Sequence, residues 1–278
     1  SVDGIYAFGH MNIDGALMDM YPNCRVISNY GVGVDHIHLE DANERGIPVG
    51  NTPDVLNGAT ADMAIALMLA VGRQMVEADK YARGSDFTKL DSGFMLGREI
   101  HSSTIGIVGM GRIGCEIARR ARYGFGMNVL YHNRRPDKDA ESKFDAQYME
   151  NLHDLLHQSD YVVLSCPLTK ETTNLIDAKA LSSMKSTGIL VNVARGGVVD
   201  TDALLNALES RAIYGAGLDV TEPEPLPRDH RLLKLDNVVI MPHLGSATVQ
   251  TRRAMAELSV ENLLLGLDGN GLKCQVKI

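Results

Sequence analysis

The sequence predicts an α/β protein with a doubly wound parallel sheet and a second, smaller α/β domain. From Thr104 onward, short and continuously apolar runs alternate with helical patterns, which is typical of strands that a parallel sheet buries on both faces. A glycine-rich loop at residues 109–114 follows the first of these runs and opens a helical pattern. The two ends of the chain carry further strand-like and helical stretches, which predict the smaller domain.

The predicted large sheet consists of six apolar runs at residues 104–108, 128–131, 161–165, 188–193, 215–220 and 237–241. The clearest helices between them are residues 113–123, 151–158 and 201–210, and Asp200 or Thr201 is suited to cap the last of these. A Rossmann-type domain of two mononucleotide-binding halves has six strands that alternate with helices in this way. We therefore expect residues 55–266 to form a nucleotide-binding domain.

The ends of the chain predict a smaller, discontinuous domain formed by residues 1–54 and 267–278. Two long helices, expected at residues 58–83 and 246–267, would connect it to the nucleotide domain. The first half of the earlier helix is apolar almost all round, which indicates a core or an oligomer interface. The other expected elements are strands at residues 4–7, 25–28 and 48–50 and a helix at residues 38–45.

Composition narrows the class of protein. With 278 residues, of which 45% are hydrophobic and 22% charged, the chain is typical of a globular protein. Its net charge of −8 argues against nucleic acid and anionic membranes as partners. The uncharged run at residues 63–72 is too short to span a bilayer, and the N-terminus shows no signal-peptide pattern.

The cysteines and paired histidines indicate neither a disulfide framework nor a metal site. The spacing of the cysteines is neither C-x-x-C nor that of a zinc site, and it fits a reducing compartment, the cytoplasm, best. His153 and His157 are four residues apart on a predicted helix, and residues 35–38 contain two more histidines. Neither group has a third ligand nearby in the sequence, so we expect packed or solvated side chains and no metal. The cysteines are Cys24, Cys115, Cys166 and Cys274.

The glycine-rich loop has the pattern G-x-G-x-x-G, with Gly109, Gly111 and Gly114 at the glycine positions and Arg112 and Ile113 before the last one. The pattern alone is weak, but here it follows a predicted strand and opens a predicted helix. Glycines let the backbone approach a pyrophosphate at the helix N-terminus, where N–H groups and the helix dipole favour an anion. The loop therefore predicts a dinucleotide-binding enzyme; the alternative is a glycine turn that only packs.

The segment after the second predicted strand indicates which dinucleotide binds. NAD-preferring sites usually have Asp or Glu about 20 residues beyond the loop, where it bonds the ribose hydroxyls. Here Asn133, Arg134 and Arg135 occupy that place, and the first carboxylate is Asp137. Two arginines are suited to a 2′-phosphate, so we expect NADP(H) as the preferred cofactor and NAD(H) as the second. The alternative is a solvated basic turn.

Three polar residues follow the last three predicted strands: Arg195, Glu224 and His243. Ligands of open α/β sheets bind beyond the carboxyl ends of the strands, so all three are expected at the edge where the glycine loop lies. Arginine can hold a carboxylate by two hydrogen bonds, and histidine can pass a proton near neutral pH. A carboxylate bonded to the other ring nitrogen would fix the imidazole. The set predicts hydride transfer from a nicotinamide to a 2-keto acid.

Motifs spread over nearly all 278 residues carry a family resemblance. They read NYGVGVDH at residues 29–36, NTPDVL at 51–56, GMGRIG at 109–114, NVARG at 192–196, GLDV at 217–220 and PHLGS at 242–246. In these motifs and their order the chain resembles the D-2-hydroxyacid dehydrogenases, and among them most closely the glyoxylate/hydroxypyruvate reductases. The resemblance implies that the smaller domain is a substrate domain beside an NADP-binding domain. It also implies a homodimer with the helix at residues 58–83 near the interface.

The resemblance also implies roles for individual residues. The catalytic Arg, Glu and His of the family correspond to Arg195, Glu224 and His243. The family's substrate contacts correspond to Val32, Gly33, Arg195 and Ser246. Its cofactor contacts correspond to the glycine loop, to Asn133, Arg134 and Arg135, and to Pro167, Val193, Asp219 and Gly245.

The chain departs from the family's pattern in two places. Similar proteins begin several tens of residues earlier, so we expect the smaller domain to lack an N-terminal segment and to leave a sheet edge and apolar surface uncovered. The reductases also carry a Trp before the nucleotide domain, where the ring of a partner subunit closes the active site, whereas this chain has no Trp. Phe94 and Met95 are the candidates to take its place.

The sequence therefore predicts NADPH-dependent reduction of glyoxylate or hydroxypyruvate to the D-2-hydroxy acid, with the hydride from the nicotinamide and the proton from His243. Three alternatives remain: a 2-ketogluconate-type reductase with a larger pocket, a nucleotide-sensing corepressor from a branch of the same family, and a non-enzymatic structural role. The basic turn at residues 133–135 favours a metabolic NADPH enzyme over an NAD(H) sensor.

Overall fold

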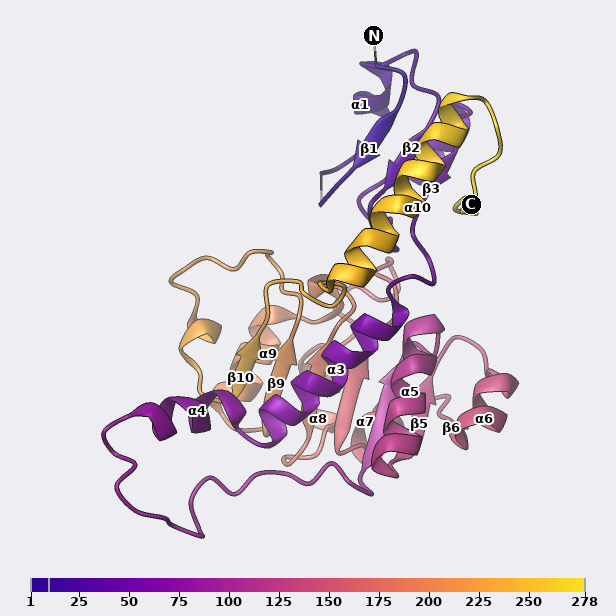
Figure 1. Ribbon diagram of the computed structural model, residues 1–278. Coiled ribbons are helices and arrows are strands. Elements are labelled where there is room, and N and C mark those ends of the chain that lie inside the picture. The colour runs from indigo at the N-terminus through magenta and orange to yellow at the C-terminus, as the bar shows by residue number, and fades with distance from the viewer. Residues whose placement is uncertain (1, 10, 278) are drawn as a thin grey trace. The chain divides into compact units, whose positions relative to one another are not determined.

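The structure, a computed structural model, describes residues 2–9 and 11–277 and contains two compact units (Figure 1). The small unit comprises Ser1–Ala59 and Ser246–Ile278, and the large unit comprises Thr60–Gly245. The second segment of the small unit therefore begins at Ser246, whereas the predicted nucleotide domain extends to residue 266.

Within the described residues, the large unit contains a sheet of seven parallel strands in the order β10-β9-β8-β7-β4-β5-β6. The chain winds outward from β4 in both directions, which confirms the predicted doubly wound sheet. Strand β6 is not predicted from the sequence, because three residues at a sheet edge are too few for a periodic pattern. The strands are β4 (Thr104–Val108), β5 (Asn128–His132), β6 (Ala146–Tyr148), β7 (Tyr161–Leu164), β8 (Ile189–Asn192), β9 (Gly215–Leu218) and β10 (Val238–Ile240).

Helices cover both faces of this sheet, which explains why the strands are continuously apolar. Tyr161 and Val163 of β7 pack into one core, Val162 and Leu164 pack into a second, and none of the four is more than 1% exposed. The first core includes side chains of α3 (Asn57–Gly72), α5 (Arg112–Phe125) and α6 (Lys138–Phe144). The second includes side chains of α7 (Leu152–Gln158), α8 (Ala178–Ser183), α9 (Thr201–Glu209) and the 3-10 helices η1 (Gly196–Val198) and η2 (Arg231–Lys234).

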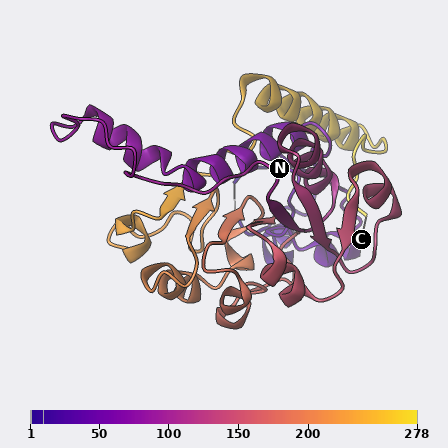
Figure 2. The ribbon, with the colours of Figure 1, turned by 90° about the horizontal axis from the view of Figure 1, so that it is seen from below.

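The single long helix predicted at residues 58–83 is wrong, because the chain breaks it into α3 and α4 (Met75–Arg83) with a bend of 58°. Gly72 ends α3 where a Cβ atom would lie 2.8 Å from the Tyr161 hydroxyl, and Gln74 takes a left-handed backbone with φ of 50°. Helix α4 projects away from the sheet of its own unit, and all its residues keep some exposure (Figure 2). Among the described residues, no single helix is long and apolar enough to cross a membrane.

The described part of the small unit has a sheet of three parallel strands, β1 (Ile5–Ala7), β2 (Ile27–Asn29) and β3 (Val49–Gly50), in the order β1-β2-β3. The same unit contains two short helices, α1 (Gly15–Asp19) and α2 (Leu39–Glu44). Strand β1 is an edge strand, and apolar side chains at and after it are exposed. They are Tyr6 (41%), Phe8 (67%) and Met11 (66%).

The long C-terminal helix α10 (Val249–Leu267) belongs to the small unit because buried polar bonds hold it to the small sheet. The hydroxyl of Ser28 in β2 donates to the carbonyl of Ser259 at 2.6 Å. The Asn262 amide donates to the Asn51 carbonyl at 3.1 Å and accepts the Cys274 N–H at 3.0 Å. These bonds place residues 246–266 in the smaller domain and correct the predicted boundary.

We expect Asn262→Ala to lower the free energy of unfolding by about 2–4 kcal/mol, because it leaves the Asn51 carbonyl and the Cys274 N–H without their partner. The matched control is Asn270→Ala, at an exposed asparagine, where a change within about 0.5 kcal/mol is expected. Urea unfolding midpoints measure both. Equal midpoints for the two variants would contradict the packing of α10 on the small sheet.

Candidate active site

The glycine-rich loop joins β4 to α5 and leaves open space at the helix N-terminus. Gly109 has φ of +100°, and a Cβ atom there would lie 2.6 Å from the Cys166 backbone nitrogen. A Cβ atom at Gly114 would lie 2.2 Å from the Gly109 carbonyl oxygen, so neither glycine can carry a side chain without a shift of the backbone. Around a Cβ atom at Gly111, by contrast, the described residues place no heavy atom within 4 Å.

These features fit the pyrophosphate of a dinucleotide. Gly111 is the N-cap of α5, a helix of 14 residues, and Arg112 and Ile113 lie in its first turn. The N–H groups and the dipole at such a terminus favour a phosphate, and the absence of a side chain at Gly111 lets it approach. The Ser165 hydroxyl, for which the sequence gives no signal, donates to the Gly109 carbonyl at 2.7 Å and holds the loop from the end of β7.

The turn after β5 is bonded to the same loop. The side-chain oxygen of Asn133 accepts the Met110 N–H at 2.8 Å. Arg134 and Arg135 follow and are exposed. The first carboxylate beyond them, Asp137, accepts the Ala140 N–H at 3.0 Å as the N-cap of α6. The carboxylate that could bond ribose hydroxyls is thus engaged in capping a helix, and the turn presents two guanidinium groups.

Arg195 follows β8 in a turn that a buried amide braces. Asn192, the last residue of β8, is 1% exposed; its side chain donates to the Arg195 carbonyl at 2.9 Å and accepts the Ala194 N–H at 3.0 Å. At Gly196 a Cβ atom would lie 2.0 Å from the Thr221 carbonyl oxygen. The turns after β8 and β9 therefore pack backbone against backbone, which fixes where the Arg195 side chain begins.

The structure brings Glu224 and His243 together. A carboxylate oxygen of Glu224 lies 2.9 Å from Nδ1 of His243, and the two side chains are 23% and 36% exposed. They come from the turns after β9 and β10, which are neighbours in the sheet. The partly exposed imidazole is thus bonded to a carboxylate through one of its two ring nitrogens, an arrangement suited to proton exchange near neutral pH.

Asp219, predicted as a cofactor contact, is hydrogen-bonded to the turn that carries His243. Its carboxylate is 2% exposed and accepts the Leu244 and Gly245 N–H groups at 2.7 Å each. Its carbonyl accepts the His243 N–H at 2.9 Å, and His243 has a left-handed backbone with φ of 56°. Burial raises the pKa of the Asp219 carboxyl, while the two N–H bonds oppose that shift by stabilising the charged form.

The other residues predicted for the site lie in both units. In the large unit, the Pro167 carbonyl accepts the Thr172 hydroxyl at 2.7 Å, and the Val193 N–H donates to Leu164 at 3.3 Å. Val32 and Gly33 lie in the turn after β2 of the small unit, and Ser246 begins the second segment of that unit.

The predicted histidine pairs have partners within the protein. His153 Nδ1 lies 2.8 Å from the Ser183 hydroxyl, and His36 Nε2 lies 3.2 Å from the Asn29 side-chain oxygen. Among residues 2–9 and 11–277, no group of three His, Cys, Asp or Glu residues could hold a metal.

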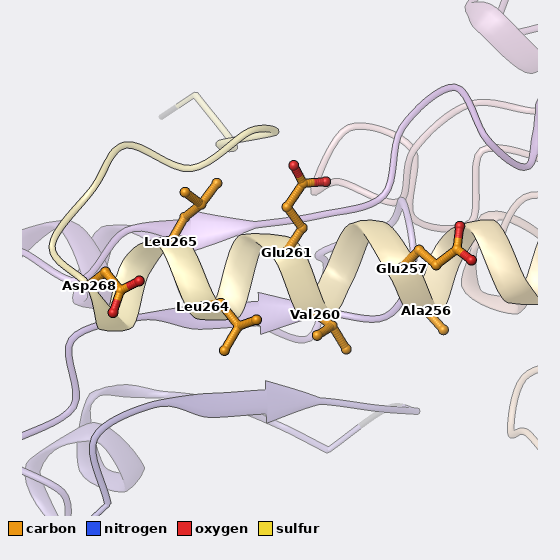
Figure 3. A pocket seen from close by; sticks show the side chains of 7 residues that line it. All are labelled: Ala256, Glu257, Val260, Glu261, Leu264, Leu265 and Asp268. Carbon is orange, nitrogen blue, oxygen red and sulfur yellow. The ribbon is translucent and has the colours of Figure 1, made fainter.

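A groove along α10 is a different kind of surface. Figure 3 shows Ala256, Val260 and Leu264 along one side of the helix and Glu257 and Glu261 on another. Its remaining lining residues are Leu265 and Asp268. Aliphatic and acidic side chains alone provide no group that binds an anionic 2-keto acid, so the candidate active site lies at the strand ends of the large sheet.

Comparison with known proteins identifies the family of this chain. Residues 65–245 match the family described as D-isomer specific 2-hydroxyacid dehydrogenase, NAD binding domain. The glyoxylate reductase of Thermococcus onnurineus is 47% identical over 272 residues, which cover 96% of this chain and 80% of that protein. The glyoxylate reductase of Pyrococcus furiosus is 48% identical over 267 residues, which cover 95% of this chain and 79% of that protein.

Solved structures show the same fold. A Thermus thermophilus protein, 47% identical, superposes with a TM-score of 0.88 over 96% of this chain and 83% of its own. An NADPH-dependent glyoxylate/hydroxypyruvate reductase from Sinorhizobium meliloti, in complex with NADP and malonate, is 36% identical. It superposes with a TM-score of 0.90 over 99% of this chain and 84% of its own. The glycine loop described above therefore belongs to a domain that binds a nicotinamide cofactor.

We expect Gly111→Ala to weaken NADPH binding by about tenfold or more without lowering the melting temperature, because its methyl group enters open space that the phosphates need. The control is Gly114→Ala, which should lower the melting temperature as well, since its Cβ atom meets the Gly109 carbonyl. NADPH fluorescence titration and thermal melts measure the two effects. Unchanged NADPH affinity of Gly111→Ala would show that the cofactor does not use this space.

Proposed function

Since the chain belongs to the D-isomer specific 2-hydroxyacid dehydrogenases, a family of NAD(P)-dependent oxidoreductases, we propose that it reduces glyoxylate or hydroxypyruvate to the D-2-hydroxy acid with NADPH. The observation that carries this proposal is the contact of 2.9 Å between Glu224 and His243 at the same sheet edge as the glycine loop. Relatives named glyoxylate reductase support the choice of substrate.

His243 is the proton donor in this proposal. A bound nicotinamide supplies the hydride for the carbonyl carbon of the 2-keto acid. His243 Nε2 gives its proton to the carbonyl oxygen, where negative charge develops as the hydride arrives. Glu224 holds the ring through Nδ1 and so fixes the orientation of the imidazole.

Arg195 and the turn after β2 are assigned to the substrate. The Arg195 guanidinium, on the turn that Asn192 braces, binds the carboxylate and carbonyl oxygens of the 2-keto acid. The backbone N–H groups of Val32 and Gly33 and the side chain of Ser246 add further contacts. A guanidinium that bonds both oxygens neutralises the substrate carboxylate and orients the carbonyl.

The preference for NADPH follows from the turn after β5. The segment about 20 residues beyond the glycine-rich loop, where an NAD-preferring site usually has a carboxylate, contains Asn133, Arg134 and Arg135. The carboxylate of Asp137 caps α6. A 2′-phosphate carries charge that the two exposed guanidinium groups can match, whereas Asp137, the first carboxylate of this segment, is used at the N-terminus of α6. NAD(H) remains the second cofactor in this proposal.

We also assign a homodimer, with the segment of residues 75–97 at its interface. This segment, the α4 arm, contains α4 and the chain that follows it. On it, the Phe94 ring packs against the Tyr81 ring, with 4.6 Å between the centroids and 49° between the planes. Phe94 and Met95, proposed in place of the family's Trp, belong to this largely exposed apolar segment, which a second copy would bury. Exposed large apolar residues of the arm are Met75, Val76, Phe87, Leu90, Phe94 and Leu96. A cytoplasmic compartment, where its cysteines stay reduced, completes the proposal.

We expect the protein to oxidise NADPH when glyoxylate or hydroxypyruvate is added, and His243→Ala to lower kcat by about 100-fold or more because it removes the proton donor. NADPH affinity should not change in the variant, since its proposed part is proton transfer. Absorbance assays with NADPH and NADH against glyoxylate, hydroxypyruvate and 2-ketogluconate measure this. Turnover of 2-ketogluconate alone would indicate a larger-pocket reductase, and no turnover of any 2-keto acid would refute an enzyme.

Arg134→Asp should weaken NADPH binding by about tenfold or more and leave NADH binding nearly unchanged, because only NADPH carries the 2′-phosphate. Arg253→Asp, at an exposed arginine of α10, is the control and should change neither affinity. Cofactor fluorescence titrations measure both. Equal losses for NADPH and NADH would argue against contact of Arg134 with the phosphate.

A further inference from the structure

The turn after β2, residues 30–36, has its carbonyl oxygens fixed by surrounding donors. The Gly31 carbonyl accepts the Asn29 amide at 3.1 Å and the Thr52 N–H at 3.0 Å. The Val32 carbonyl accepts the Asn51 amide at 2.8 Å, and the Gly33 carbonyl accepts the Asn29 amide at 2.8 Å. Three consecutive carbonyl groups are therefore directed toward the protein framework.

The N–H groups of the same turn are arranged differently. Within residues 2–9 and 11–277, the N–H groups of Val32 and Gly33 donate to no other group. Consecutive N–H groups whose carbonyls are all turned away make a concave, positive site for an anion. If either peptide rotated, a carbonyl oxygen would replace an N–H group and repel a carboxylate.

Asn29 is the residue that connects these bonds. It ends β2, is 2% exposed, and donates to two of the three carbonyls through one amide group. Its side-chain oxygen lies 3.2 Å from Nε2 of His36 at the far end of the turn. An amide has distinct donor and acceptor ends, so a donor at His36 Nε2 keeps the NH₂ end of Asn29 on the carbonyls.

We propose that Asn29, oriented by His36, is a positioning residue for the 2-keto acid: it turns away the Gly31 carbonyl, which shares a peptide group with the Val32 N–H, and holds the Gly33 carbonyl at the next turn of the chain. Asn51 holds the Val32 carbonyl, which shares a peptide group with the Gly33 N–H, and the two N–H groups then bind the substrate carboxylate. The proposal rests on the function proposed above. The Asn29 side chain is buried and its amide is bonded within the protein, so we assign it an effect on substrate binding rather than on the chemical step.

Asn29→Asp and Asn29→Ala test the proposal, because both remove the NH₂ donors and Asp keeps the shape. We expect each to raise KM for glyoxylate and the Kd of oxamate, a non-reducible analogue, by about tenfold or more. The kcat at saturating glyoxylate and the KM for NADPH should stay within about twofold, as expected for the loss of a contact made equally in ground and transition states.

His36 supplies a second test with less disturbance of the core. His36→Gln keeps a donor near the place of Nε2 and should retain the KM for glyoxylate, whereas His36→Leu removes it and should raise KM. The matched control is Asn237→Ala, because the Asn237 amide also donates to two carbonyls, those of Leu208 and Tyr214, but lies in the large unit. It should lower the melting temperature and leave both KM values unchanged.

The outcomes separate this proposal from the function on which it rests. Failure of the unaltered protein to reduce any 2-keto acid overturns the proposed function, while oxamate binding, measured by calorimetry on the NADPH complex, still compares Asn29→Asp with the unaltered protein. Unchanged KM and oxamate affinity in both Asn29 variants overturn the positioning role. Equal losses of kcat, NADPH affinity and melting temperature also overturn it, since they would show that Asn29 only stabilises the fold.

Discussion

The candidate site depends on the carboxylate of Asp219, which the protein keeps in its interior at the carboxyl end of β9. A buried carboxylate is costly unless it is hydrogen-bonded, and Asp219 meets this requirement with the N–H groups of Leu244 and Gly245 at 2.7 Å. These bonds hold the turn after β10 in the observed conformation. The left-handed backbone of His243, and with it the approach of the imidazole to Glu224, follows from that conformation.

Other strand ends use an amide in the same way. Asn192 ends β8 and braces the turn of Arg195, Asn133 follows β5 and holds the glycine loop, and Asn29 ends β2 and sets the turn of Val32. Just beyond the carboxyl ends of parallel strands, backbone N–H and carbonyl groups no longer have partners in the sheet. A short amide can satisfy both kinds at once. The proposed catalytic side chains are partly exposed, and the buried residues beside them determine where those side chains begin.

Burial on both faces of the sheet leaves a local apolar pattern, and the sequence therefore predicts the strands from β4 to β10 except β6. Other features cannot be predicted from the local sequence pattern, because they depend on residues far apart in the sequence. The end of α3 depends on the approach of Gly72 to Tyr161, and the place of α10 depends on the bond from Ser28 to Ser259. The strand-end rule predicts that Glu224 and His243 share an edge, but not their contact. The bracing roles of Asn29 and Asn192 are not predicted either, because polar residues are common at strand ends.

The discontinuity of the small unit has a consequence for the order of folding during synthesis. The large unit is continuous, so every strand of its sheet has been made once Gly245 leaves the ribosome. The strands of the small sheet are synthesised before those of the large sheet. Ser28 and Asn51 can bond to α10 only after more than 200 further residues have been added. Until then the face of β2 and β3 that α10 covers is open to chaperones and proteases. The earliest part of this chain is thus the last to become native.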